Sequence, residues 1–234
     1  MNIDINFNVY SDTPKGKDPD SYSPTLRNYH KNLWSKILPN GTLFKLNETI
    51  SMRLYHKSES GEFILSSDSI ANTYSKIKST QNIIKNIKTE EIKKFVSLCS
   101  TIGGYIIFPS ERINNKMTIN GARGINKKIR DRFDLTLECI RRYYRDEDNP
   151  LNETLKRYSS FFTLFVNFQG YVDFFLLQDL VDNNYSEIKY FIPFKSFEES
   201  SLPSDTNQYR LYKESLSNFV VSRNKRIKNF KFSL

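Results

Sequence analysis

The sequence predicts an α+β fold in a single domain, and three observations lead to this prediction. Hydrophobic residues make up 38% of the 234 residues and aromatic residues 14%, which is enough for a packed core. Runs of alternating apolar and polar residues, typical of strands, are concentrated before residue 110. Apolar residues three or four positions apart, typical of helices, dominate after it. We therefore expect a small antiparallel or mixed sheet packed with several helices, with 1–110 as a strand-rich part and 111–234 as a helix-rich part.

The first half of the chain is expected to combine short strands with three helices. Ser23 followed by Pro24 is typical of a helix start, because the hydroxyl caps the first turn and proline fits it. The residues "KSESGE" predict a hairpin turn between two strands. The elements expected here are a strand at 5–10, a helix from 24 to about 37, strands within 42–66, and helices at 66–79 and 89–100.

The second half is expected to be mainly helical. Gly103 and Gly104 lead into the short buried strand "YIIFP". The stretch 151–181 is too apolar for the surface, so Phe162, Phe165, Phe174 and Leu177 should be buried. The elements expected after "YIIFP" are a helix over about 124–145, two helices within 149–182 broken at Gly170, a strand at 187–194, and a basic helix at 209–230.

The charge of the chain is distributed unevenly. The net charge is +9, and residues 75–145 carry 16 basic and 6 acidic side chains, whereas residues 146–206 carry 4 and 11. This pattern fits a polyanionic binding partner, although the basic and acidic segments could also neutralise one another.

The remaining features place the chain in a cellular compartment. No apolar run reaches the ~18 residues of a membrane span, and the first residues lack the features of a signal peptide. Cys99 and Cys139 lack metal-site spacing and are interpreted as buried free thiols. We therefore expect a cytoplasmic protein that does not insert into membranes.

The run "TINGARGINKKIRDRF" at 118–133 predicts an anion-binding cradle at a helix start. Glycines let the backbone approach a phosphate, and arginine offers it a planar fork of donors. The competing interpretation has Arg123 turned inward and paired with a carboxylate such as Asp173 or Glu138. The predicted phosphate-binding residues are Gly121, Arg123, Gly124, Lys127, Lys128, Arg130 and Arg132.

The proline-rich loop at 12–20 and the helix after it hold the candidates for catalysis. These candidates are Asp12, Asp18, Asp20 and His30. "DPD" resembles a carboxylate pair that could hold Mg²⁺, although aspartates before and after prolines often only cap turns. Tyr143, Tyr144 or Trp34 could stack on a base if they are exposed.

Four segments together resemble a family of uncharacterised bacterial proteins, a domain of unknown function, over nearly the whole chain. The resemblance implies no reaction and no catalytic residues. The segments that carry it are "FNVYSDTPKGKDPDSYSPTLRNYHKNLWSKILPNG", "GGYIIFP", "TINGARGINKKIRDRFDLTLECIRRYY" and "FFTLFVNFQGYVDFFLLQDLV".

Two classes of function follow from these features. The first is a protein that binds a phosphate-bearing partner, foremost nucleic acid or a nucleotide, and that could also act on it as a nuclease or nucleotide-modifying enzyme. The second is a non-enzymatic module, such as an inhibitor or antitoxin-like protein, whose basic surface meets an acidic protein surface. A pocket lined jointly by segments 12–30 and 118–134 favours the enzyme, whereas a flat basic face favours the module.

Overall fold

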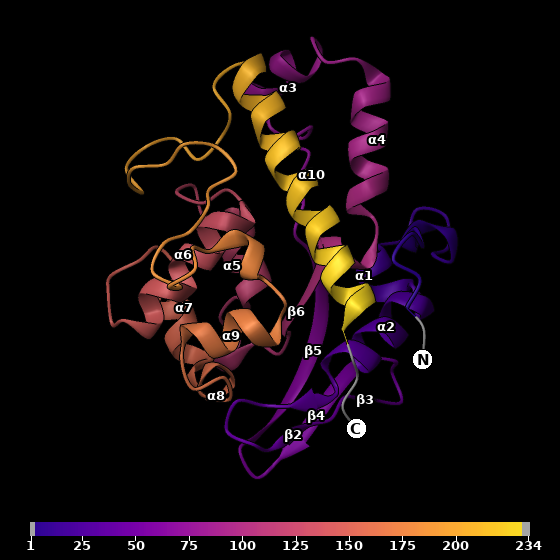
Figure 1. Cartoon of the computed structure of the whole chain (residues 1–234), viewed down its shortest axis with the longest axis vertical. Coiled ribbons are helices and arrows are strands. Elements are labelled where there is room, and N and C mark those ends of the chain that lie inside the picture. Colours follow the sequence, from indigo (N-terminus) through magenta and orange to yellow (C-terminus); the bar gives the residue numbers. More distant parts are fainter. Residues whose placement is uncertain (1–2, 231–234) are drawn as a thin grey trace.

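The computed structural model describes residues 3–230 and has the α+β architecture predicted from the sequence (Figure 1). Over these residues it forms one domain with ten α-helices and two small antiparallel sheets. All six strands lie before residue 110.

The main sheet is antiparallel with the strand order β3-β4-β5-β6. The predicted hairpin is confirmed, because β4 and β5 pair through the register Ser58↔Gly61 around "KSESGE". The polar run 66–69 continues β5 and pairs with β6, so the helix expected at 66–79 is wrong. The strands are β3 (Asn47–Glu48), β4 (Leu54–Ser58), β5 (Gly61–Ser69) and β6 (Tyr105–Pro109), with β1 (Lys36–Ile37) and β2 (Leu43–Phe44) as a separate hairpin.

The first four helices include one well-predicted start and two helices that the sequence did not predict. Ser23 accepts a hydrogen bond from the Leu26 backbone N–H (3.1 Å) and caps α2, as expected. The strand expected at 5–10 is wrong, because this segment ends in the short 3-10 helix η1 (Val9–Ser11). The helices missed from the sequence are α1, in a segment expected to be a loop, and α3. The bounds are α1 (Pro19–Tyr22), α2 (Pro24–Trp34), α3 (Lys78–Ile84) and α4 (Thr89–Cys99).

The C-terminal helices are shorter and more numerous than expected. Of the predicted helix 124–145, residues 124–125 end a preceding helix and residues 133–144 form the next one, with a turn between them. The stretch 149–182 forms three helices with Gly170 inside the last of them. The strand expected at 187–194 is reduced to a single bridge, Val181↔Ile188. The predicted basic C-terminal helix is confirmed as α10. The bounds are α5 (Ile119–Ile125), α6 (Phe133–Tyr144), α7 (Asn152–Arg157), α8 (Ser159–Thr163), α9 (Phe168–Phe174) and α10 (Thr206–Asn229), with η2 (Ile102–Gly104), η3 (Ile113–Asn115) and η4 (Gln178–Leu180) between helices and strands.

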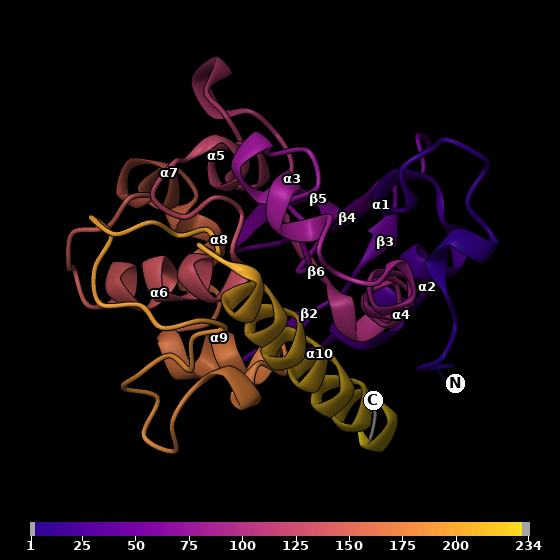
Figure 2. The same cartoon turned by 90° about the horizontal axis from the view of Figure 1, so that it is seen from above.

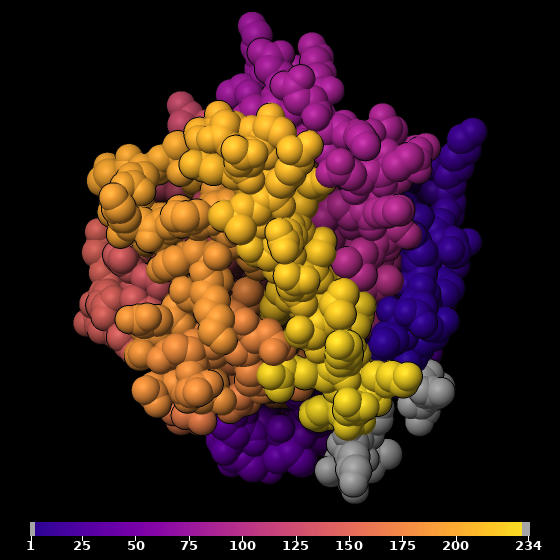
Figure 3. Space-filling view, turned by 45° about the horizontal axis from the view of Figure 1, so that its top comes forward, coloured from indigo at the N-terminus to yellow at the C-terminus, as the bar shows by residue number. Residues whose placement is uncertain are grey.

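Two groups of helices flank the sheet, and α3, α4 and α10 lie together apart from them (Figures 1 and 2). Helices α5–α9 cover one side, α1 and α2 lie on the other, and β5 contacts both α1 and α8. Helix α10 packs against α4 and η2 and runs across one face of the molecule (Figure 3). Because the sheet is enclosed from both sides, the polar end of β5 lies between the two groups.

The core is strongly aromatic, as expected. Phe162, Phe165, Phe174 and Leu177 are all buried. Cys99 and Cys139 are buried free thiols, which confirms that prediction. No helix among residues 3–230 combines the length and the hydropathy needed to cross a bilayer.

Candidate functional site

The predicted cradle at 118–133 has a different geometry from the one expected. Thr118 caps α5 by accepting the Gly121 N–H (3.2 Å), so Gly121 and Gly124 lie inside a short helix and not in a loop ahead of one. The helix ends in a tight turn, in which Asp131 N–H donates to the Arg123 carbonyl (3.0 Å). Arg130 and Asp131 adopt positive φ angles of 46° and 62° in this turn. The glycines therefore present no row of free backbone N–H groups to an anion.

Arg123 is fully buried and points into the protein. Its guanidinium contacts the Asp68 carboxylate, lies 3.2 Å from Asp131 Oδ1, and donates from Nε to Thr136 Oγ1 (3.2 Å). Because a buried guanidinium must be paired, these contacts fix its position. The inward alternative is therefore correct for Arg123, and the phosphate-binding prediction for this residue is wrong.

The carboxylates that pair with Arg123 differ from those proposed from the sequence. Asp173 instead accepts hydrogen bonds from Gln178 Nε2 (2.8 Å) and the Tyr185 hydroxyl (2.9 Å). Glu138 is buried between Arg141 and Arg142, with a Nε–carboxylate distance of 2.7 Å to each.

The other predicted phosphate ligands are dispersed. Arg132 is fully buried, where it pairs with the equally buried Asp134 and donates to the carbonyl oxygen of Ser201 (3.1 Å). Its assignment as a phosphate ligand is therefore wrong too. Lys127 and Lys128 are exposed, and Lys128 pairs with Glu198 (2.5 Å). The predicted residues do not converge on one anion.

The predicted aspartates have three separate roles. Asp12 accepts hydrogen bonds from Ser23 Oγ (2.6 Å) and Thr25 N–H (2.9 Å), which hold the start of α2. Burial raises the pKa of Asp12, but these hydrogen bonds lower it by more, so the pKa lies below its usual value. Asp18 caps α1 by accepting the Asp20 N–H (3.1 Å). Asp12 is therefore a structural residue, and only Asp18 and Asp20 reach the pockets described below.

Asp20 is the most perturbed carboxyl group of the four predicted catalytic residues. Its Oδ1 is buried, and no hydrogen-bond partner for it lies among residues 3–230. Burial, followed by the charges of Asp68 and Asp18, raises the pKa of Asp20 to about 8. At neutral pH this side chain is therefore a neutral carboxylic acid that carries a proton.

Asp68, on β5, stays ionised beside it. Burial raises the pKa of Asp68 to about 6, while the charge of Arg123 opposes that shift. Asp68 therefore keeps its negative charge at pH 7, and this charge helps to hold the proton on Asp20. The two carboxyl groups have their pKa values on opposite sides of neutrality.

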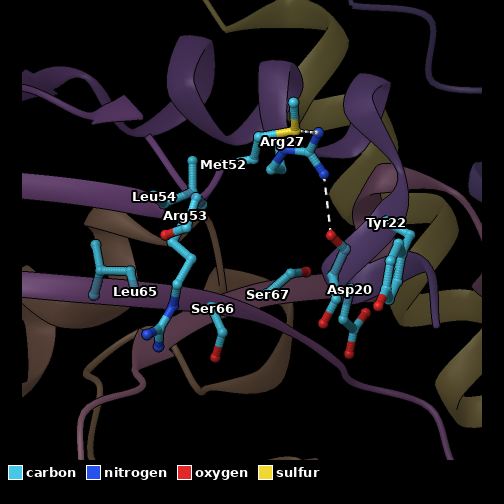
Figure 4. A pocket seen from close by; sticks show the side chains of 11 residues that line it. Asp20, Tyr22, Arg27, Met52, Arg53, Leu54, Leu65, Ser66 and Ser67 are labelled. Carbon is cyan, nitrogen blue, oxygen red and sulfur yellow. Dashed lines mark hydrogen bonds between the residues drawn. The ribbon is translucent and has the colours of Figure 1, made fainter. Parts of the chain in front are cut away.

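Two pockets share Asp20. The first, here called the arginine pocket, has a volume of about 390 Å³. Figure 4 shows Asp20, Arg27 and Arg53 on different sides of it, with Ser66 and Ser67 of β5 between them. Arg27 donates to the Ser21 carbonyl (3.1 Å) and has its Nε 3.5 Å from Glu48.

The second, here called the tyrosine pocket, has a volume of about 630 Å³. Asp20 lies between the two pockets and contributes to both. The tyrosine pocket joins residues of η1, α1, β6 and the α5–α6 turn; those used below are Tyr10, Asp18, Asp20, Lys76, Arg130 and Asp131.

His30 does not line either pocket. Trp34 Nε1 donates to His30 Nδ1 (2.9 Å), and Trp34 can only donate, so the ring proton is on Nε2 and faces Ser67 Oγ (2.9 Å). Burial, and then the charge of Arg223, lowers the pKa of His30 to about 3. The ring is locked as a neutral hydrogen-bond donor, which excludes His30 from acid–base chemistry at neutral pH.

The structure adds three residues that the sequence arguments missed: Arg27, Arg53 and Asp68. A signal for Asp68 exists, because "SSDS" continues an alternating strand with four polar residues and so marks a strand end that carries polar groups. No comparable signal marks the two arginines. Among residues 3–230, no three His, Cys, Asp or Glu side chains are grouped so that they could hold a metal ion.

Comparisons with known proteins identify the family but no activity. The model of a family of unknown function (DUF6994) matches residues 3–227. No curated protein and no solved structure matches the chain.

Proposed function

Because the chain belongs to DUF6994, a family of unknown function, we propose its activity from its own geometry: it is an enzyme that acts on a phosphate-bearing substrate, with Asp20 as the general acid. The observation that carries this proposal is the tyrosine pocket, which is lined by Asp18 and Asp20 of one segment and by Gly124, Arg130 and Asp131 of the other. A pocket between these two segments is what the enzyme hypothesis requires and the flat binding module does not.

The chemistry rests on the proton of Asp20. A carboxylic acid with a pKa of about 8 is protonated at pH 7 and is still acidic enough to give its proton to an alkoxide-like leaving oxygen. In hydrolysis of a phosphate ester, water adds to phosphorus, the ester P–O bond breaks, and Asp20 protonates the departing oxygen. The proton released by the attacking water then restores the acid. Environments that push two carboxyl pKa values apart, as for Asp20 and Asp68, are typical of such sites.

The choice of a phosphate-bearing substrate rests on the arginine pocket. Arg27 and Arg53 line it, and guanidinium groups suit the oxygens of a phosphate. Arg53 is exposed and has no carboxylate within ion-pair distance among residues 3–230, whereas Arg27 also pairs with Glu48. A protonated Asp20 would not repel that anion, whereas an ionised one would. The buried free cysteines support a reducing, cytoplasmic setting for this enzyme.

Hydrolysis of a dinucleoside monophosphate, whose leaving oxygen is an alkoxide that needs a proton, tests the proposal directly. We expect turnover by the wild-type protein and a loss of about 100-fold or more in kcat for Asp20→Asn, the usual scale of general acid catalysis. Because Asp20 must be protonated, kcat should also fall above about pH 8.

Asp148→Asn serves as the control, since Asp148 is exposed and lies in neither pocket. It should leave turnover unchanged. Equal turnover by Asp20→Asn and the wild type would overturn the role of Asp20. A wild-type protein that hydrolyses neither this ester nor a single-stranded oligonucleotide would overturn the phosphate-ester reaction.

A further inference from the structure

A strongly basic arm projects from the body of the protein. It comprises residues 76–94, which include α3 and the start of α4, and Figure 3 shows it protruding at the top of the molecule. Among residues 3–230, only one of its lysines, Lys93, has a carboxylate within ion-pair distance (Glu90, 3.0 Å). The exposed lysines of this lysine arm are Lys76, Lys78, Lys85, Lys88, Lys93 and Lys94.

The arm leads to the candidate active site. Lys76, its first lysine, lines the tyrosine pocket, as does Asp20. Arg130, from the α5–α6 turn, adds a further cation to the same pocket. Around this pocket the cations Lys76, Arg130 and Arg123 balance the carboxylates Asp18, Asp68 and Asp131, so a polyanion on the arm would reach the general acid without meeting a net negative charge.

An exposed aromatic ring lies at the same pocket. The Tyr10 side chain is 54% exposed and lines the tyrosine pocket. The rings considered for stacking from the sequence are less accessible, since Trp34 is fully buried and Tyr143 and Tyr144 pack against the core. An exposed ring stacks on an unpaired base, which a single strand offers and a duplex does not.

We propose that the lysine arm binds a single-stranded nucleic acid and directs it to Asp20, an inference that names the substrate class of the proposed enzyme and rests on that proposal for the chemistry. Lysines are compact, flexible point charges, and a series of them matches the regular phosphates of a strand without reading its sequence. Binding is therefore expected to tolerate any sequence and to weaken steeply with salt.

The experiment measures the fluorescence anisotropy of a labelled 20-nucleotide single strand at several salt concentrations. We compare the wild type with Lys85→Glu/Lys88→Glu and with Lys156→Glu/Lys195→Glu, which makes the same change in net charge at exposed lysines outside the arm. If each arm lysine neutralises one phosphate, the arm variant should lose about 1.4 from the magnitude of the log–log salt slope, since each contact contributes about 0.7. The control variant should keep the wild-type slope.

Tyr10→Ala provides an independent measurement. It should weaken binding of the single strand while leaving the salt slope unchanged, because stacking involves no counterion release. Circular dichroism of each variant confirms that the fold is intact.

The possible outcomes separate this inference from the proposed reaction. An equal loss of salt slope in both double variants would show that binding depends only on net charge, and would overturn the proposed role of the lysine arm. Tighter binding of a polyglutamate peptide than of the strand would overturn it in favour of an acidic protein partner. If the strand binds through the arm but is never hydrolysed, the role of the arm is supported and the proposed enzyme activity is rejected. If the dinucleoside monophosphate is hydrolysed but the strand does not bind, the enzyme activity is supported and the role of the arm is rejected.

Discussion

Asp20 and Asp68 show how two identical side chains acquire different chemistry from their surroundings. Asp68 is only partly exposed but contacts the guanidinium of Arg123, so its pKa rises only to about 6. Asp20 is largely buried without such a partner and also feels the charge of Asp68, so its pKa rises to about 8. Burial of a carboxyl group without a cation is costly in free energy, and sites that retain one commonly use it.

The stability of the protein should record this cost. The unfolded chain ionises Asp20 near its ordinary pKa of 3.8, whereas the folded protein keeps the proton up to about pH 8. The unfolded state therefore binds fewer protons in this range, and the free energy of unfolding falls as the pH rises from about 4 to about 8. Asp20→Asn removes this dependence. The melting temperature of Asp20→Asn relative to that of the wild type should therefore rise between about pH 4 and about pH 8 and stay constant above about pH 8.

Thermal melts between pH 4 and pH 9 check this prediction, with Asp148→Asn as the exposed control. A constant difference between Asp20→Asn and the wild type at every pH would contradict the raised pKa.

At the scale of elements, the α5–α6 region shows how a correct apolar pattern can be assigned to the wrong structure. Ile129 and Phe133 are both buried, as the expected helix 124–145 required. The chain nevertheless leaves the helix after Ile125 and turns back through Arg130 and Asp131 at positive φ. This turn places Asp131 against the guanidinium of Arg123, and a continuous helix would not bring Asp131 N–H to the Arg123 carbonyl. The tertiary ion pair overrides the local periodicity.

The glycines of these elements provide a sharp test. A Cβ on Gly124 would meet no atom within 4 Å, so Gly124→Ala should stabilise α5 by about 0.5–1 kcal/mol through its better helix propensity. A Cβ on Gly104 would lie 2.0 Å from the backbone oxygen of Cys99, which cannot move aside cheaply. Gly104→Ala should therefore destabilise the protein.

Urea denaturation of both variants measures the two effects. Destabilisation by Gly124→Ala would show that a neighbouring group of the protein does approach this glycine closely.

At the scale of the whole molecule, aromatic packing joins the helix groups to the sheet. Phe165, between α8 and α9, has its ring centroid 5.0–5.3 Å from those of Phe161, Tyr171, Phe174 and Phe175. Arg223 of α10 contributes a polar link, because it is fully buried and donates to the carbonyl oxygens of Phe175 (3.0 Å), Gly103 (3.0 Å) and Tyr105 (2.7 Å). These contacts hold α9, α10 and β6 in one body.

Phe165→Ala should therefore lower the free energy of unfolding by roughly 3–5 kcal/mol, the usual range when a core aromatic side chain is truncated to alanine. Chemical denaturation measures this loss, and Val166→Ala is the control, because the neighbouring Val166 is 59% exposed. A Phe165→Ala protein as stable as the wild type would show that this core can collapse around the missing ring.

The sequence by itself determined the features that depend on local pattern and composition. Capping chemistry predicts the start of α2 at Ser23, and turn chemistry predicts the β4–β5 hairpin. Hydrophobic periodicity predicts the α+β class, the strand "YIIFP", the helix α10 and the burial of the aromatic residues within 162–177. Asp18 and Asp20 were also identified as candidates in this way, from a dense polar loop stiffened by proline.

Only the tertiary structure decided which charged residues face inward and which face a pocket. A charge pattern is the same whether a guanidinium meets a ligand or a distant carboxylate, and Asp68 lies 55 residues from Arg123 in the chain. The pKa of Asp20 likewise depends on burial between α1 and β5 and on the charge of Asp68, which no local signal near residue 20 reports. Desolvation and Coulomb interaction act through space, so the site emerges only when distant segments are brought together.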